Sequence, residues 1–120
     1  MQIGIDLGAS KIEYVLLDDS GNEHHRERIE VPKDYKNTIA IIKKIVIELE
    51  KKAGKELPVG VCHPGIHSIQ TGLIKNAPNS FWINGKPLQR DLRAEIGKEI
   101  YCENDANCFA LSEAIDGSGK

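Results

Sequence analysis

An amphipathic helix lies between strand-like segments and thereby restricts the topology that this chain can adopt. Apolar residues recur at steps of three and four, with lysines on the opposite face and Gly54 after the last turn: Ile39, Ile42, Ile45, Val46, Leu49 and Ala53. Such a helix carries the chain across one face of a sheet, so the strand that follows it runs parallel to its neighbour. The pattern therefore predicts a sheet that includes parallel strands and is covered by helices.

Strand-like segments that precede this helix predict an antiparallel meander. Gln2–Asp6 and Ile12–Asp18 are rich in aliphatic and β-branched residues, and the short segment Gly8-Ala9-Ser10-Lys11 between them predicts a hairpin. A second turn at Asp18–Asn22 leads to a polar third strand over Glu23–Val31. We expect these strands to pair in sequence order.

The second half of the chain predicts further crossovers. Leu57–Cys62 is a short apolar run typical of a buried strand, and it ends at the turn His63-Pro64-Gly65. Residues 66–87 show little periodicity, and we expect a long loop with ligand contacts there. The remaining segments predict a helix on Leu88, Leu92 and Ile96, a strand over Glu99–Glu103 and a helix over Ala106–Ile115. The predicted fold is α/β, a mixed sheet with the order β-β-β-α-β-α-β-α.

Composition excludes several classes of protein. A chain of 120 residues is expected to form one domain, and its net charge of −2 provides no basic field for nucleic acid. No apolar run approaches the ~20 residues of a membrane span, and nothing after Met1 marks the chain for export, so we expect a cytoplasmic protein with no membrane partner. The cysteines are odd in number and lack CxxC spacing, which favours buried free thiols at Cys62, Cys102 and Cys108.

A first candidate site is the segment Asp6-Leu7-Gly8-Ala9-Ser10-Lys11, which combines a carboxylate, a small-residue turn, a hydroxyl and a cation. Such a turn can bind phosphate oxygens, while the carboxylate can hold hydrated Mg²⁺. The alternative is a hairpin turn selected only for its backbone angles.

A second candidate is Glu103-Asn104-Asp105-Ala106-Asn107, where a predicted strand ends and a helix begins. A carboxylate at the carboxyl end of a parallel strand can accept the proton of a substrate hydroxyl. The alternative is an ordinary helix N-cap at Asn104 or Asp105.

A third candidate combines Val59–Gly65 with Asn76-Ala77-Pro78-Asn79. Gly65 permits a ligand to approach the backbone closely, and asparagine side chains offer the donor and acceptor pairs that sugar hydroxyls need. Here the alternative is a pair of ordinary turns.

Taken together and in this order, the three motifs resemble the N-terminal lobe of a ROK-family sugar kinase, in the actin-like, ribonuclease H-like ATPase superfamily. The resemblance covers essentially all 120 residues. It is carried by Ile3–Glu13, by Val59–Gly65 and above all by Glu103–Cys108, with the sequence ENDANC. Residues 74–77 and 82–88 are most similar to the bacterial fructokinases of the family, and N-acetylglucosamine kinases share much of the same frame.

The resemblance implies ATP-dependent phosphorylation of a hexose hydroxyl, in a fructokinase-like or related enzyme. It implies that Asp105 is the catalytic base and that the sugar contacts are Asn104, Gly65 and Asn79. An N-acetylhexosamine kinase is an alternative.

The resemblance also implies a nucleotide site in the first hairpin. Gly8, Ser10 and Lys11 match the loop that binds the phosphates of ATP, and Asp6 matches the acidic position near Mg²⁺. Ala9 stands where the family usually has a second glycine, and the Cβ that it adds is expected to weaken phosphate binding.

Complete members of the family have a second lobe with the adenosine pocket and a zinc-binding cysteine cluster. Residues 1–120 are thus expected to be an N-terminal lobe that is inactive and monomeric alone and part of a homodimer in the full-length protein. One alternative is the sugar-sensing module of a ROK-type transcriptional regulator, although such regulators normally carry an N-terminal helix-turn-helix. Another is a purely structural lobe.

Overall fold

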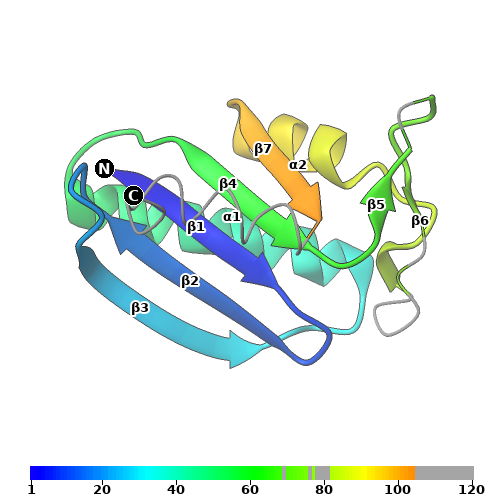
Figure 1. The fold of residues 1–120 in the computed structure, drawn as a ribbon, viewed down its shortest axis with the longest axis horizontal. Helices are drawn as coiled ribbons and strands as arrows, with labels where there is room; N and C mark the ends of the chain where they lie inside the picture. Colours follow the sequence, from blue (N-terminus) through cyan, green and yellow to red (C-terminus); the bar gives the residue numbers. More distant parts are fainter. Residues whose placement is uncertain (69, 76, 78–81, 105–120) are drawn as a thin grey trace.

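A five-stranded mixed sheet forms the centre of the protein in the order β3-β2-β1-β4-β7 (Figure 1). The computed structural model describes residues 1–68, 70–75, 77 and 82–104. Its strands are β1 (Gln2–Leu7), β2 (Lys11–Leu17), β3 (Glu23–Glu30), β4 (Val59–His63) and β7 (Ile100–Asn104). The described helices are α1 (Tyr35–Ala53) and α2 (Leu88–Ile96).

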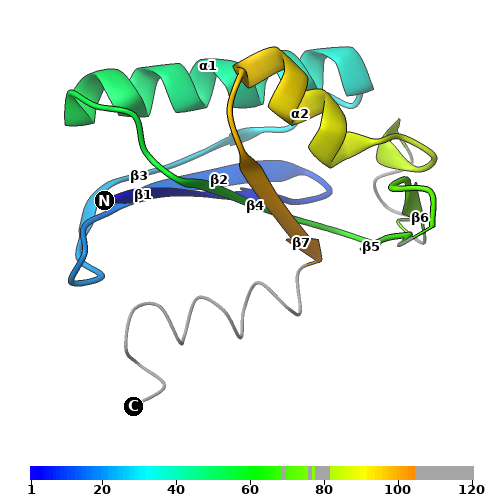
Figure 2. The same ribbon diagram turned by 90° about the horizontal axis from the view of Figure 1, so that it is seen from above.

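The directions of the strands confirm the predicted meander and crossovers. β1 pairs with β2, and β2 with β3, in antiparallel fashion. β4 is parallel to β1, and β7 is parallel to β4. Figure 2 shows α1 and α2 on the same face of the sheet, which is where helical crossovers between parallel strands must lie.

Local signals set the ends of α1. The side chain of Asp34 accepts a hydrogen bond from the N–H of Asn37 at 2.8 Å and so caps the first turn. Gly54 follows the last turn with φ of 77°, and its N–H donates to the carbonyl of Glu50 at 2.8 Å. The predicted helix is confirmed, with its first residue at Tyr35.

The core lies between the sheet and the helices. In β1 the side chains of Ile3, Ile5 and Leu7 are buried, while Asp6 is exposed on the opposite face. The apolar side chains of α1 that predicted the helix face this core, including Ile42, which is fully buried. Each fully buried aliphatic side chain contributes about 1.5–3 kcal/mol, so the core fixes which face of each strand is left for function.

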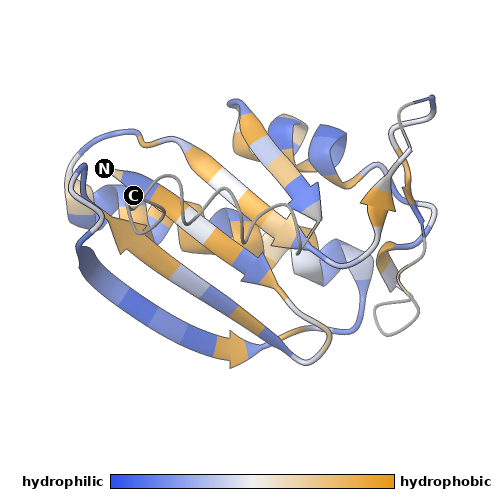
Figure 3. Ribbon diagram, in the orientation of Figure 1, coloured by the Kyte–Doolittle hydropathy of each residue, from blue (hydrophilic) through white to orange (hydrophobic). Residues whose placement is uncertain are grey.

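The edge strand β3 is polar along most of its length, as Figure 3 shows. Arg28 donates to the carboxylate of Glu13 at 2.8 Å, and Arg26 bonds to Glu13 and, at 2.6 Å, to Glu23. Charged side chains on an edge strand discourage pairing with other chains. The polar third strand predicted from the sequence is confirmed, and the structure places it at one edge of the sheet.

The segment predicted as one long loop contains a small ribbon. β5 (Ile66–His67) pairs with β6 (Ile74–Lys75) in antiparallel fashion. Strands of two residues are too short to show an alternating pattern, which is why periodicity did not reveal them. The helix predicted over Ala106–Ile115 lies outside the described residues. Neither α1 nor α2 combines the length and the apolar character that crossing a membrane requires.

A partly buried polar cluster joins the end of α1, the start of β4 and the turn before β7. The ammonium group of Lys98 donates to the carboxylate of Glu50 and to the carbonyl of Leu57. The same carboxylate accepts from the N–H of Leu57 at 2.9 Å. The side chains of Lys98 and Glu50 are only 18% and 19% exposed, so solvent replaces these bonds poorly.

Replacing Glu50 should test this cluster. Glu50→Ala removes the acceptor of the Leu57 N–H and the partner of the Lys98 ammonium, so we expect the free energy of unfolding to fall by about 1–3 kcal/mol. Urea denaturation measures the change. Glu48→Ala, at an exposed position of the same helix, should alter stability by less than about 0.5 kcal/mol. Equal losses in the two variants would contradict the assignment.

The turn between β2 and β3 predicts a dependence of stability on pH. The carboxylate of Asp18 bonds to His24 and accepts from the N–H groups of Asn22 and Ser20, each at 2.9 Å. The bond to His24, with these backbone bonds, lowers the pKa of Asp18 from 3.8 to about 2. A lowered pKa contributes stability that is present above pH 3.8 and is lost as the pH falls through about 2.

Asp18→Asn should therefore be less stable than the parent at pH 6, and the difference should shrink on acidification between pH 3.8 and about 2. Thermal unfolding of both proteins across this range provides the measurement. A difference that stays constant with pH would show that the charge of Asp18 is not responsible.

Candidate functional site

The carboxyl ends of β1, β4 and β7 meet at one edge of the sheet, because the three strands are parallel (Figure 1). In the register of the sheet Cys62 lies between Asp6 and Glu103, and His63 lies beside Asn104. Each of the three motifs predicted from the sequence follows or ends one of these strands. The fold thus brings the described parts of all three to the same edge, which is where α/β sheets bind ligands.

The turn between β1 and β2 is fixed by backbone bonds. The N–H of Gly8 donates to the carbonyl of Lys11 at 2.9 Å, and the N–H of Val31 donates to the carbonyl of Ser10 at 3.1 Å. A Cβ on Gly8 would lie 2.8 Å from the carbonyl oxygen of Lys11. Gly8 is therefore required by the hairpin itself, and its N–H is used within the turn.

Two side chains of this turn, those of Ser10 and Lys11, are exposed, as is that of Asp6 in β1. The ammonium of Lys11 lies 3.5 Å from the carboxylate of Glu30, and both side chains are well exposed, so this pair is weak and does not prevent the lysine from binding another anion. A hydroxyl and an ammonium suit phosphate oxygens, which makes the turn compatible with the phosphates of ATP.

The donor set also fits Mg²⁺ in its usual environment. Across the described ranges, no three side chains of His, Cys, Asp or Glu gather to hold a metal ion. Mg²⁺ is commonly held by one or two carboxylates together with phosphate oxygens and water. Asp6, at the end of β1, can supply such a carboxylate.

The segment His63-Pro64-Gly65 after β4 is packed tightly against the chain itself. His63 is fully buried, and its Nδ1 donates to the carbonyl of Pro64 at 2.9 Å. Gly65 has φ of 74°, and a Cβ there would lie 2.4 Å from the carbonyl oxygen of Lys75 and 3.1 Å from the Cβ of Ala77. The sequence suggested that Gly65 leaves space for a ligand. In the structure, the space beside its Cα is filled by Lys75, the last residue of β6, and by Ala77.

The structure places the remaining predicted site residues only in part. Asn104 is the last residue of β7. Asp105 and Asn79 lie outside the described residues, so their predicted roles as catalytic base and sugar contact remain predictions.

The cysteines only partly follow the expectation of buried free thiols. Cys102 is free, and burial raises the pKa of its thiol to about 12. At neutral pH this thiol stays protonated and is a poor nucleophile. Cys62 is disulfide-bonded, so the expectation is wrong for that residue. Cys108 lies outside the described residues.

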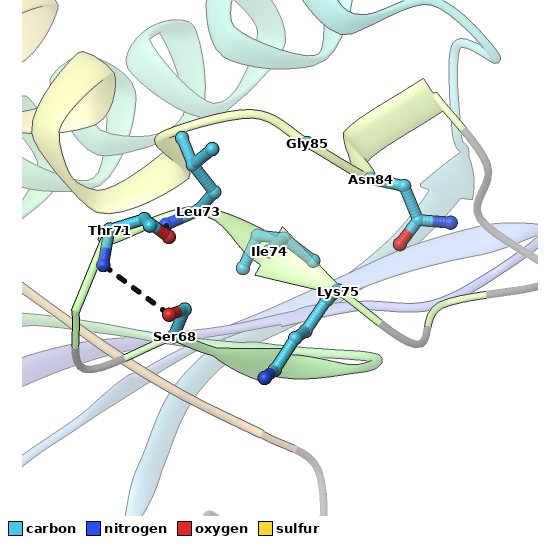
Figure 4. A pocket seen from close by; sticks show the side chains of 7 residues that line it. All are labelled: Ser68, Thr71, Leu73, Ile74, Lys75, Asn84 and Gly85. Carbon is cyan, nitrogen blue, oxygen red and sulfur yellow. Dashed lines mark hydrogen bonds between the residues drawn. The ribbon is translucent and has the colours of Figure 1, made fainter.

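A surface hollow of about 430 Å³ lies on the β5–β6 ribbon and is lined in part by Asn84 and Gly85 (Figure 4). Its lining includes none of Gly8, Gly65 and Asn104. The hollow thus lies within residues 66–87, where ligand contacts were expected, but it is separate from the residues predicted to bind the phosphates and the sugar.

Comparisons with known proteins agree with this arrangement. The model of the ROK family matches residues 2–120. An N-acetyl-D-glucosamine kinase of Haemophilus influenzae (strain 86-028NP) is 39% identical over 117 residues, which cover 97% of this chain and 38% of the relative. This chain therefore spans well under half the length of that relative.

Solved structures support the fold. A ROK family glucokinase from Streptomyces griseus, in complex with glucose and AMPPNP, is 25% identical with a TM-score of 0.82, over 99% of this chain and 38% of that chain. A ROK family transcriptional regulator, a homolog of the E. coli MLC protein, is 18% identical with a TM-score of 0.70, over 93% of this chain and 29% of that chain. The latter similarity concerns the fold alone. The expected α/β fold of the ribonuclease H-like, actin-like ATPase superfamily is confirmed.

Substitutions of two glycines should distinguish packing from backbone conformation. Gly65 and Gly72 have nearly equal φ, 74° and 73°, but only at Gly65 would an added Cβ have neighbours within 4 Å. Gly72→Ala should cost about 1 kcal/mol of stability from its positive φ, and Gly65→Ala about 2–4 kcal/mol because the clash is added. Chemical denaturation measures both. Equal costs would show that the contact with Lys75 and Ala77 is not tight.

Proposed function

The chain belongs to the ROK family, and we propose that it is the N-terminal lobe of a kinase that phosphorylates a hexose or N-acetylhexosamine with ATP. The observation that carries this proposal is the common edge of β1, β4 and β7. A turn with exposed phosphate-binding groups, the Pro64-Gly65 segment and Asn104 meet there. A phosphoryl transfer needs donor and acceptor sites side by side in this way.

In the proposed reaction Asp105 is the catalytic base. It is the next residue after Asn104, with which β7 ends. Its carboxylate accepts the proton of the sugar hydroxyl as that oxygen bonds to the γ-phosphorus of ATP, while the bond from this phosphorus to the β-phosphate oxygen breaks and ADP leaves. Asn104, Gly65 and Asn79 orient the sugar for this attack.

The first hairpin holds the phosphates in the same proposal. The hydroxyl of Ser10 and the ammonium of Lys11 bind phosphate oxygens, while the bonds of Gly8 and Val31 keep the turn in place. Asp6 would hold Mg²⁺, and this ion would neutralise part of the phosphate charge.

The relatives bear on the choice of sugar. The relative from Haemophilus influenzae is an N-acetyl-D-glucosamine kinase, and the solved glucokinase contains glucose. We therefore propose N-acetyl-D-glucosamine or glucose as the acceptor. The fructokinase-like substrate predicted from residues 74–77 and 82–88 has no specific support from these relatives.

The rest of the proposal concerns the whole protein. Because the chain corresponds to 38% of the Haemophilus influenzae relative, a second lobe supplies the adenosine pocket and closes over the sugar. The N-terminal lobe alone does not catalyse the phosphorylation. We propose a cytoplasmic homodimer for the complete protein. The similarity in fold to a transcriptional regulator makes a sugar-sensing module the second candidate function.

The test is a kinase assay on the full-length protein that contains both lobes. N-acetyl-D-glucosamine, glucose, mannose and fructose are offered with ATP and Mg²⁺ to the parent and to Asp105→Asn. We expect phosphorylation of N-acetyl-D-glucosamine or glucose by the parent. We expect kcat to fall about 10²–10⁴-fold in the variant, since it lacks the general base. Calorimetry should show that the variant still binds the sugar.

Asp19→Asn provides a matched control, because Asp19 is exposed and pairs with the amino terminus of Met1; its kcat should equal that of the parent. An active Asp105→Asn would remove this residue from the proposed mechanism. A parent that binds sugar but phosphorylates none, and that binds DNA in a sugar-dependent manner, would replace the kinase by the sensing module.

A further inference from the structure

We propose that Asn84 is a positioning residue that holds the segment His63–Gly65 in place for the sugar; the proposal rests on the proposed function, in which Gly65 contacts the sugar. The side-chain amide of Asn84 reaches Gly65 through one intermediate residue, Ala77. Neither the sequence motifs nor the family resemblance gave Asn84 such a role.

Asn84 makes a pair of hydrogen bonds with the backbone of Ala77. Its Oδ1 accepts from the N–H of Ala77, and its Nδ2 donates to the carbonyl of Ala77, each at 3.0 Å. In an antiparallel sheet, two opposite residues can exchange two such bonds through their backbone N–H and C=O groups. Here the side-chain amide of Asn84 takes the place of one backbone. Figure 4 shows the Asn84 side chain directed away from Ser68 and Thr71.

The backbone that follows Asn84 is anchored to β6 by two hydrogen bonds. The N–H of Gly85 donates to the carbonyl of Ile74 at 2.7 Å, and the N–H of Ile74 donates to the carbonyl of Lys86 at 3.0 Å. Ile74, Ala77 and Ile83 are buried. The backbone next to Asn84 is therefore held in position. The side-chain amide of Asn84 continues the hydrogen bonding from Ile74 to Ala77, which lies beyond the last residue of β6.

Ala77 in turn lies against Gly65. A Cβ built on Gly65 would be 3.1 Å from the Cβ of Ala77 and 3.3 Å from its nitrogen. A methyl group would therefore not fit between Gly65 and Ala77. Because packed segments transmit displacement, a shift of Ala77 is expected to reach Gly65. If Ala77 loses its two bonds, the support of Gly65 on this side is lost, and the groups that meet the sugar become less ordered.

The first test compares the kinetics of variants of the full-length protein. Asn84→Ala removes both bonds. Asn84→Asp has the same shape and keeps the acceptor for the Ala77 N–H, but it sets a carboxylate oxygen against the Ala77 carbonyl. We expect the KM for the sugar to rise about fivefold or more in both variants, as expected for a lost hydrogen bond. The KM for ATP and kcat should stay within about twofold, because the nucleotide hairpin is not involved.

Asn37→Ala is the matched control, since Asn37 is an exposed asparagine in the first turn of α1; its sugar KM should equal that of the parent. General destabilisation lowers the amount of active enzyme and not its affinity for one substrate. A selective rise in the sugar KM therefore supports positioning. Equal rises in the KM for sugar and for ATP, or none, would overturn the inference.

A second readout does not depend on activity. The Ala77 amide is protected from hydrogen exchange by Oδ1 of Asn84, so in NMR its exchange should accelerate in Asn84→Ala and change little in Asn84→Asp and Asn37→Ala. Unchanged exchange in Asn84→Ala would overturn the inference. A parent that phosphorylates no sugar would overturn the proposed function, and with it the role of Asn84 toward sugar. The exchange rate would still decide whether Asn84 holds this segment.

Discussion

The parallel pairing of β4 with β1 is the constraint on which the rest of the structure depends. It exists because α1 carries the chain across one face of the sheet between the meander and β4. If β4 ran in the opposite direction, the Pro64-Gly65 segment would leave the sheet at the edge far from Gly8. The apolar face of α1 therefore determines the topology, and through it the meeting of the predicted phosphate and sugar segments.

Several elements could be predicted because their signals are local. The three- and four-residue spacing of isoleucines, together with Gly54, predicted α1, and the turn at Gly8–Lys11 predicted the first hairpin. The ribbon of β5 and β6 could not be predicted, because two-residue strands have no measurable period. The pairing of Asn84 with Ala77 was equally hidden, since one polar side chain replaces a strand neighbour there.

The glycines of the candidate site show the limit of prediction from residue type. At Gly65 the sequence predicted close approach of a ligand to the backbone, and at Gly8 it predicted phosphate binding, but a missing Cβ alone does not say what occupies the space. In both places it is a carbonyl oxygen of the chain itself, that of Lys11 or of Lys75. The roles of Ser10, Lys11 and Asp105 were predicted from the motifs and from the family resemblance, and they stay predictions, while the fold shows that the described parts of these motifs lie at one edge of the sheet.

The ion pairs of Glu13, which lies beside Asp6, show how charged side chains join β2 to the edge strand. Glu13 is the neighbour of Asp6 across the antiparallel pair, on the same face. Arg28 and Arg26 bond to Glu13 and hold the pKa of that carboxyl below its usual range. Its negative charge is thus balanced by β3, and Glu13 is committed to joining β2 with the edge strand. Arg26 and Arg28 therefore tie β2 to the edge strand on the face of the sheet that also carries Asp6, and the ionised Glu13 is the group on which both arginines converge.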